Sequence, residues 1–134
     1  MIICDASIAE WVFEPHGGSV GSSTNAIGWV QNGKLTGGFA IESCNGVNCF
    51  AHIRIDGYVS RKFWFAMVDW VFNQIGCERM TAPVNEINEK SIKMVENVGF
   101  TKEATLKKAA STGDDLHFYV LWKENCRILK WSIK

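Results

Sequence analysis

The 134-residue chain has the length of one domain with one hydrophobic core. Its 14 basic and 14 acidic residues balance, so it lacks the charge excess that nucleic-acid or acidic-membrane binding requires. No apolar run reaches the roughly 20 residues that span a bilayer, and the N-terminal residues lack the basic region of a secretion signal. We therefore expect a single cytoplasmic domain, residues 1–134, with no nucleic-acid and no membrane partner.

The first half of the chain predicts one short helix followed by three strands. Residues 8–14 carry apolar side chains on one side of a helix that ends at Pro15, with Ser7 and Glu10 as a candidate capping box. Apolar runs at 26–30 and 35–41 flank an Asn-Gly pair, which is the strongest short signal for a hairpin. Residues 48–56 alternate between polar and apolar side chains, as a strand with two unlike faces does. The three strands should form an antiparallel meander.

The second half changes to a helical period. A helix apolar on most sides runs from Ser60 to Gly76 and is followed by a strand at 78–84. A second helix begins after a polar turn with Asn88 and Ser91, and Gly99 ends it. Two strands follow at 101–109 and 116–122. The predicted fold class is α/β (α+β), a mixed and mostly antiparallel sheet of about six strands with helices on both faces.

The five cysteines form an odd set without a C-x-x-C pair, at positions 4, 44, 49, 77 and 126. This spacing disfavours a zinc site and a disulfide framework. Free cysteines are among the most buried residues in proteins. We therefore expect reduced, mostly structural thiols and no metal.

Three motifs in the second half carry a family resemblance. They are the strand residues 77–84, the pattern Asn88-x-x-Ser91, and residues 98–103, Val-Gly-Phe-Thr-Lys-Glu. Together they resemble the GNAT superfamily of acetyl-CoA-dependent N-acetyltransferases. Residues 113–127 are similar to the C-terminal ends of GNAT proteins encoded in bacteriophage and prophage genomes. The resemblance implies direct transfer of an acetyl group from acetyl-CoA to an amine, on a small molecule or a protein, in the host cytoplasm.

The resemblance also implies where the cofactor would lie. Acetyl-CoA would bind in the splay between the strands that end near Asp56 and Val84. The pyrophosphate loop of the family falls between residue 56 and the next helix, although its first two conserved places here hold other residue types. Glycines and a helix N-terminus favour bound phosphate, and arginine adds full charge. The expected cofactor contacts are Ile53, Ile55, Gly57, Tyr58, Val59, Ser60, Arg61, Asn88 and Ser91. For the last two, a plain helix cap is the alternative interpretation.

Three residues are candidates for the base that takes the proton of the amine. His52 stands where GNAT enzymes often activate the amine, and a histidine accepts a proton near neutral pH. Glu42 and Asp56 are rival bases. The alternatives are a histidine that only satisfies hydrogen bonds within the sheet and two solvated carboxylates. The tyrosine that protonates the departing thiolate in many relatives is replaced by Val95.

These departures support a second hypothesis, a GNAT-like phage protein that has lost catalysis. Such a protein would act as an interaction module or associate with the virion. The C-terminal residues 128–134, with an exposed-looking Trp131, are then a candidate contact or homodimerisation segment.

Overall fold

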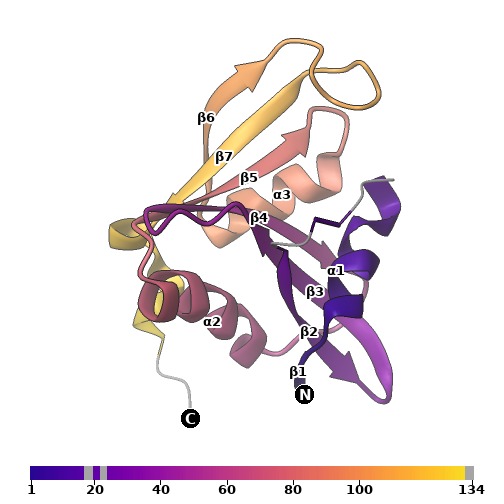
Figure 1. The fold of residues 1–134 in the computed structure, drawn as a ribbon, viewed down its shortest axis with the longest axis vertical. Helices are drawn as coiled ribbons and strands as arrows, with labels where there is room; N and C mark the ends of the chain where they lie inside the picture. Colours follow the sequence, from indigo (N-terminus) through magenta and orange to yellow (C-terminus); the bar gives the residue numbers. More distant parts are fainter. Residues whose placement is uncertain (17–19, 22–23, 132–134) are drawn as a thin grey trace.

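The computed structural model describes residues 1–16, 20–21 and 24–131. In these residues one seven-stranded sheet has the order β1-β2-β3-β4-β5-β7-β6 (Figure 1). The strands are β1 (Ile2–Cys4), β2 (Asn25–Gln31), β3 (Lys34–Glu42), β4 (Asn48–Ile55), β5 (Arg79–Asn85), β6 (Thr101–Leu106) and β7 (Leu116–Trp122). The helices are α1 (Ala6–Phe13), α2 (Arg61–Asp69) and α3 (Glu89–Val98), with short helical turns η1 (Glu14–His16), η2 (Trp70–Ile75), η3 (Lys123–Asn125) and η4 (Arg127–Lys130).

The predicted fold class is confirmed, with one strand more than expected. Every neighbouring pair is antiparallel except β4 and β5, which run parallel. The additional strand is β1, which pairs with β2 at the sheet edge. A strand of three residues is too short to show alternation, so the sequence pattern could not reveal it. β6 ends at Leu106, three residues earlier than predicted, whereas β7 has the predicted bounds.

The helix boundaries follow from capping side chains. Asp5 caps α1, since its Oδ1 accepts a hydrogen bond from the Ser7 backbone N–H at 2.9 Å. The capping box predicted at Ser7 and Glu10 is therefore wrong by two residues. Ser60 caps α2 as expected, and Gly76 ends the helical segment with a φ of 90°. Between them the chain changes from α-helix to the π-helix η2.

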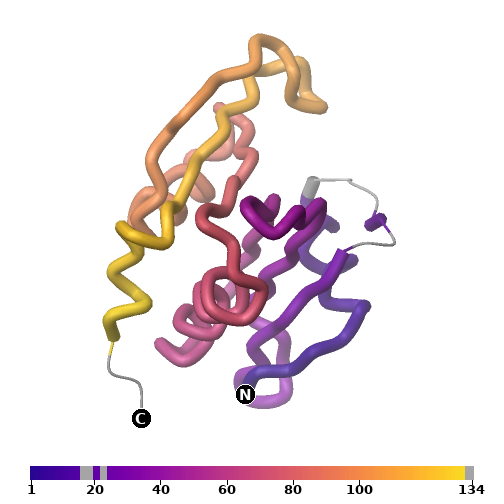
Figure 2. The backbone as a smooth tube through the Cα atoms, turned by 60° about the vertical axis from the view of Figure 1, so that its left-hand side comes forward, coloured from indigo at the N-terminus to yellow at the C-terminus, as the bar shows by residue number. Residues whose placement is uncertain are grey.

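The helices cover both faces of the sheet. Alternation along β3 directs Phe39 and Ile41 into the larger core beneath α2, while Ala40 faces α1 in a smaller core. Helix α3 adds Val95 and Val98 to the larger core, so α2 and α3 lie on the same face. The β6–β7 hairpin projects at one end of the molecule, away from α2 (Figure 2).

The C-terminal turn η4 packs against the larger core. Trp131 is partly buried there, and the guanidinium of Arg61 lies 4.2 Å above its ring centroid. The expectation of an exposed Trp131 is therefore wrong, because the tail folds back onto α2. Residues 132–134 of the proposed contact segment lie outside the described residues.

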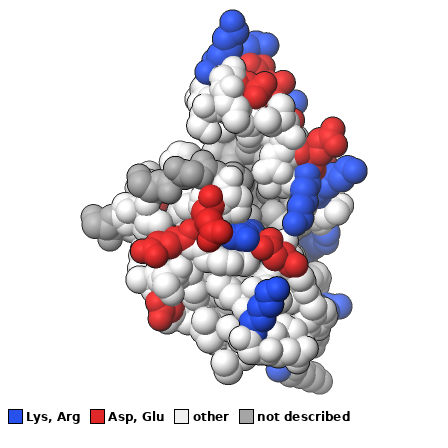
Figure 3. Space-filling model, turned by 90° about the vertical axis from the view of Figure 1, so that its right-hand side faces the viewer, with Lys and Arg blue, Asp and Glu red and all other residues white. Residues whose placement is uncertain are grey.

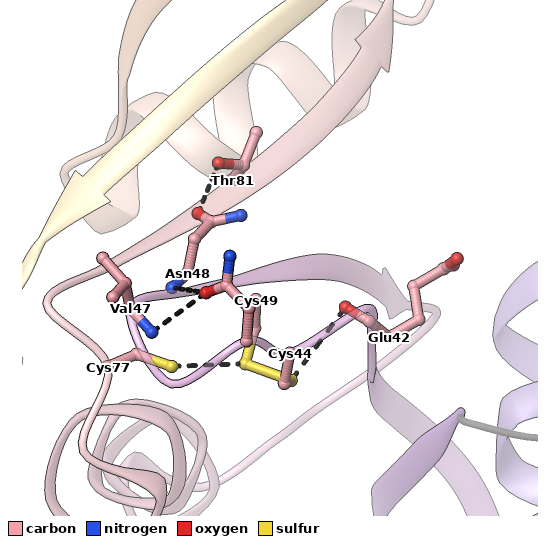
Figure 4. Close-up of a disulfide and its surroundings, with 8 residues drawn as sticks. Glu42, Cys44, Val47, Asn48, Cys49, Cys77 and Thr81 are labelled. Atoms are coloured by element: carbon pink, nitrogen blue, oxygen red, sulfur yellow. Dashed lines mark hydrogen bonds between the residues drawn. A yellow bond between two sulfur atoms is a disulfide. The ribbon is translucent and has the colours of Figure 1, made fainter.

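The expectation of reduced thiols is wrong for one pair. Cys44 and Cys49 form a disulfide across the turn between β3 and β4 (Figure 4). Spacing alone could not reveal this, because the pairing depends on a turn that brings the two Cα atoms to 4.2 Å. The other three cysteines are free, with Cys77 and Cys126 buried and Cys4 exposed.

Candidate functional site

The parallel strands β4 and β5 pair over only three residues and then diverge. Asn48, Cys49 and Phe50 pair with residues 79–81, and no further pair joins the described parts of these two strands. Beyond this point lies a cavity of about 290 Å³. Its walls come from α1, β4, β5, α3 and the β6–β7 loop: Phe13, Ala51, His52, Ile53, Ala82, Pro83, Val84, Asn85, Asn88, Ser91, Met94, Val95, Ala109, Ala110, Ser111 and Leu116.

The edge of β4 presents backbone groups to this cavity. The backbone N–H of Asp56 donates to the Thr36 carbonyl of the neighbouring strand at 2.8 Å. Because residues alternate between hydrogen-bonded and free pairs in an antiparallel ladder, Ile53 and Ile55 direct their N–H and C=O groups away from β3, beyond the last residue of β4 that pairs with β5. The carbonyl of Ile55 accepts a hydrogen bond from Lys90 Nζ at 3.0 Å, as this alternation predicts. The cleft therefore offers a row of backbone donors beside His52.

His52 and Glu42 form a pair at the wall of the cavity. The imidazole Nε2 of His52 lies 2.8 Å from Glu42 Oε2, and the His52 ring centroid lies 4.5 Å from that of Phe13. The pair is diagonal in the β3–β4 ladder, where Ala40 stands opposite His52. The His52 side chain is only 20% exposed. The structure thus joins two of the three candidate bases into one unit.

Asp56, the third candidate, is held elsewhere. Its Oδ2 accepts hydrogen bonds from Nε and Nη2 of Arg54 at 3.0 and 2.6 Å. These bonds lower the pKa of the Asp56 carboxyl below its usual value. Arg54 also donates to the carbonyl of Trp11, which anchors the ion pair to α1. A carboxylate that binds its proton so weakly is a poor general base.

The start of α3 places Asn88 and Ser91 in the cavity wall. Asn88 Oδ1 accepts a hydrogen bond from the Ser91 backbone N–H at 3.1 Å, so Asn88 is a helix cap. This hydrogen bond uses only the side-chain oxygen of Asn88, and the side-chain nitrogen Nδ2 can donate to a ligand. Val95 lines the same wall one turn further along.

The loop before α2 is fixed to β3. Thr36 Oγ1 donates to the Tyr58 carbonyl at 2.6 Å, and Val59 packs so closely over Gly37 that a Cβ there would lie 2.4 Å from Val59 Cγ1. Tyr58 itself is 63% exposed. Gly57 is exposed next to it, and Ser60 uses its hydroxyl to cap α2. The expected phosphate loop is thus a constrained turn at the N-terminus of α2.

A second cavity of about 460 Å³ lies between α2, α3 and η4. Lys90, Lys93 and Arg127 contribute to its lining, as do Ile55, Trp64, Met94, Asn97, Val98, Ile128 and Trp131. None of these three basic residues was predicted from the sequence. Lys90 and Lys93 lie three residues apart on one helix, and this spacing indicates that the two side chains share a helix face. Arg127 could not be placed from sequence, because it comes from the folded-back tail.

The β6–β7 loop forms the far wall of the first cavity. Thr112 Oγ1 accepts a hydrogen bond from Asn85 Nδ2 at 2.8 Å, and the backbone N–H of Asp115 donates to Glu86 Oε2 at 2.6 Å. These contacts tie the loop to the end of β5 and bring its small side chains, residues 109–111, to the cavity. No role for this loop was predicted from the sequence.

No protein-family model and no curated protein matches the sequence. Solved structures do match. A spermidine N-acetyltransferase from Vibrio cholerae superposes with a TM-score of 0.67 at 16% identity, covering 92% of this chain and 77% of that one. The N-acetyltransferase PseH of Campylobacter jejuni, in complex with acetyl coenzyme A, gives 0.65 at 14% identity over 92% and 99%. A GNAT-family acetyltransferase from Bacillus anthracis gives 0.60 at 16% identity over 76% and 67%.

The chain has the GNAT fold. The sheet that diverges between β4 and β5 belongs to this fold, as the sequence resemblance implied. In the described residues no group of three or more histidine, cysteine or acidic side chains is arranged to hold a metal ion. No helix in the described parts of the chain is long and apolar enough to cross a membrane.

Proposed function

We propose that this GNAT-fold protein is an N-acetyltransferase that transfers the acetyl group of acetyl-CoA directly to an amine. The observation that carries the proposal is the open cavity between β4 and β5, with the His52–Glu42 pair and free backbone donors on its wall. A GNAT-fold protein without catalysis would not need this combination. The cavity and the His52–Glu42 pair therefore favour an enzyme over a protein that has lost catalysis and acts as an interaction module.

The chain offers groups that suit the thioester and the phosphates of acetyl-CoA. The thioester would lie beside β4, where the N–H group of Ile53 can donate to its carbonyl oxygen. The phosphates would lie near residues 57–60 and the N-terminus of α2. Lys90, Lys93 and Arg127 at the second cavity supply positive charge for them. These side chains replace the basic residue that the loop itself lacks.

Bound acetyl-CoA supplies the activated acetyl group, and the chain supplies proton transfer and orientation. His52 would take the proton from the attacking amine, directly or through one water, with Glu42 holding the imidazole in place. Donors aimed at the carbonyl would stabilise the negative charge that develops on its oxygen. Ser91 lies in the cavity wall one turn before Val95, and its hydroxyl would donate to the departing thiolate, which Val95 cannot do.

We also infer that the acceptor is a small cationic amine. It would enter from the α1 side, where Figure 3 shows acidic side chains across the middle of the face around one basic group. Glu10 and Glu14 belong to α1 and η1, Glu42 pairs with His52, and Asp56 pairs with Arg54, which donates to the Trp11 carbonyl of α1. The similar Vibrio cholerae structure is a spermidine N-acetyltransferase. A protein amine is the alternative acceptor.

The test is a transfer assay that follows release of free CoA. Spermidine and a short peptide with a free N-terminus serve as acceptors, and His52→Gln is compared with the wild type. We expect turnover with spermidine, reduced about 100-fold or more in His52→Gln. The peptide as the better acceptor would overturn the inference on substrate class. Absence of turnover with every amine, at saturating acetyl-CoA, would contradict the proposed acetyltransferase activity.

A further inference from the structure

Three sulfur atoms lie together where β4 meets β5. Cys44 and Cys49 are joined, and the Cys77 sulfur lies 3.5 Å from that of Cys49 (Figure 4). Cys49 and Cys77 are fully buried, whereas Cys44 is exposed. The disulfide is therefore open to solution at one sulfur only.

The disulfide closes the turn that carries Glu42. Cys44 follows Glu42 by two residues, and Cys49 precedes His52 by three. Asn45 folds the turn by accepting hydrogen bonds from the N–H groups of Val47 and Asn48 at 3.0 and 2.9 Å. The bridge thus fixes the chain between the two members of the His52–Glu42 pair.

We propose that the Cys44–Cys49 disulfide is a reversible switch that holds Glu42 against His52 and is opened by dithiol reductants. This proposal rests on the proposed function, in which the pair is the base. In the oxidised form the turn is closed and Glu42 orients the imidazole. In the reduced form the end of β3 is released, Glu42 loses its fixed position, and acetyl transfer slows.

The chemistry balances with a dithiol as the reductant. One thiolate of the reductant attacks the exposed Cys44 sulfur, the S–S bond breaks, and Cys49 leaves as a thiolate that takes up a proton. The second thiol of the reductant then attacks the mixed disulfide and releases Cys44 as a thiol. Two electrons pass to the protein, and the reductant leaves as its own disulfide.

Cys77 does not compete for Cys49 in the resting protein. Burial raises the pKa of the Cys77 thiol, and only a thiolate attacks a disulfide. The Cys77 sulfur therefore lies beside the disulfide without reducing it. Disulfides persist in oxidising compartments and open in reducing ones, so the state of the switch follows the redox conditions around the protein.

The first experiment counts thiols in the denatured protein. Air-exposed protein should show the three free thiols of Cys4, Cys77 and Cys126, and dithiothreitol should raise the number to all five. Five free thiols before reduction would overturn the proposal.

The second experiment follows the imidazole resonances by NMR before and after dithiothreitol. The His52 signal, assigned by its loss in His52→Gln, should move on reduction, while His117 on β7 should not. Cys44→Ser should show the reduced position in either condition. Cys4→Ser is the matched control and should respond as the wild type does. An unmoved His52 signal would refute the switch.

The third experiment measures kinetics in both redox states. Reduction should lower kcat about tenfold while the Kd for acetyl-CoA changes by less than about twofold. Glu42→Gln should be insensitive to dithiothreitol, and an equal response in that variant would contradict the route through Glu42. If neither form binds acetyl-CoA, the proposed function fails, whereas the thiol count and the NMR signals still decide the switch.

Discussion

Substitution of Gly37 by alanine should weaken cofactor binding indirectly, by moving the loop that precedes α2. Gly37 lies on β3 beneath the loop that precedes α2. A Cβ at this position would lie 2.4 Å from Val59 Cγ1, 3.3 Å from Ile55 Cδ1 and 3.5 Å from Phe63 Cε2. The first contact is more than 1 Å too short for two carbon atoms, which prefer about 3.5–4.0 Å. Val59 and its loop must therefore move.

The magnitude follows from the cost of overpacking. An extra methyl group in a well-packed site costs about 1–3 kcal/mol. If the loop moves in order to relieve the contact, acetyl-CoA must restore its position on binding. A cost of about 1.4 kcal/mol corresponds to a tenfold weaker Kd. We therefore expect Gly37→Ala to weaken acetyl-CoA binding by roughly tenfold. The rest of the overpacking cost should lower the free energy of unfolding.

The assay is calorimetric titration with acetyl-CoA, together with urea unfolding. The matched variant is Gly37→Ala combined with Val59→Ala, which removes the Cγ1 atom that clashes. The double variant should recover most of the lost affinity relative to Gly37→Ala, and the coupling between the two sites should reach about 1 kcal/mol. Unchanged affinity in Gly37→Ala, or strictly additive effects, would refute the role of this loop in binding.

Three further predictions concern charged residues. Glu42→Gln should lower kcat about tenfold with little change in the Kd for acetyl-CoA, as kinetics and calorimetry can show. Lys90→Ala should weaken acetyl-CoA binding about fivefold and reduce its salt dependence, whereas Lys34→Ala, at the start of β3, should change neither. Hydrogen bonds from Arg79 lower the pKa of Glu103, so this pair stabilises the fold above the unfolded pKa of about 4.3, and that contribution is lost as the pH falls. Urea unfolding should therefore show a weaker loss of stability below about pH 4.5 in Glu103→Gln than in the wild type, and parallel pH profiles would contradict the pairing.

The sequence predicted the fold because local signals agreed along the chain. The Asn32-Gly33 pair set the β2–β3 hairpin, and its two residues have φ values of 53° and 77° as that turn requires. Gly76 and Gly99 end their helices in the left-handed conformation. Alternation along β4 placed His52 and Arg54 on the face toward α1, where Phe13 and Trp11 contact them.

The features that the sequence did not predict depend on contacts between distant segments. The pairing of Glu42 with His52 needs the register of β3 against β4, which no local pattern encodes. Arg127 reaches the second cavity only because the tail folds back along α2. The Cys44–Cys49 bridge is the exception, because it joins residues only five apart, and its formation depends on a turn shape that cysteine spacing does not encode.

The most direct test of the account is an NMR titration that compares acetyl-CoA with CoA. Both ligands should shift the backbone amides of residues 57–60 and 88–91, because they share the phosphates and the pantetheine arm. The amide of Ile53 should shift only with acetyl-CoA, since only its carbonyl oxygen accepts from this N–H group. Shifts confined to other parts of the chain, or an equal response of Ile53 to both ligands, would contradict the proposed position of the thioester.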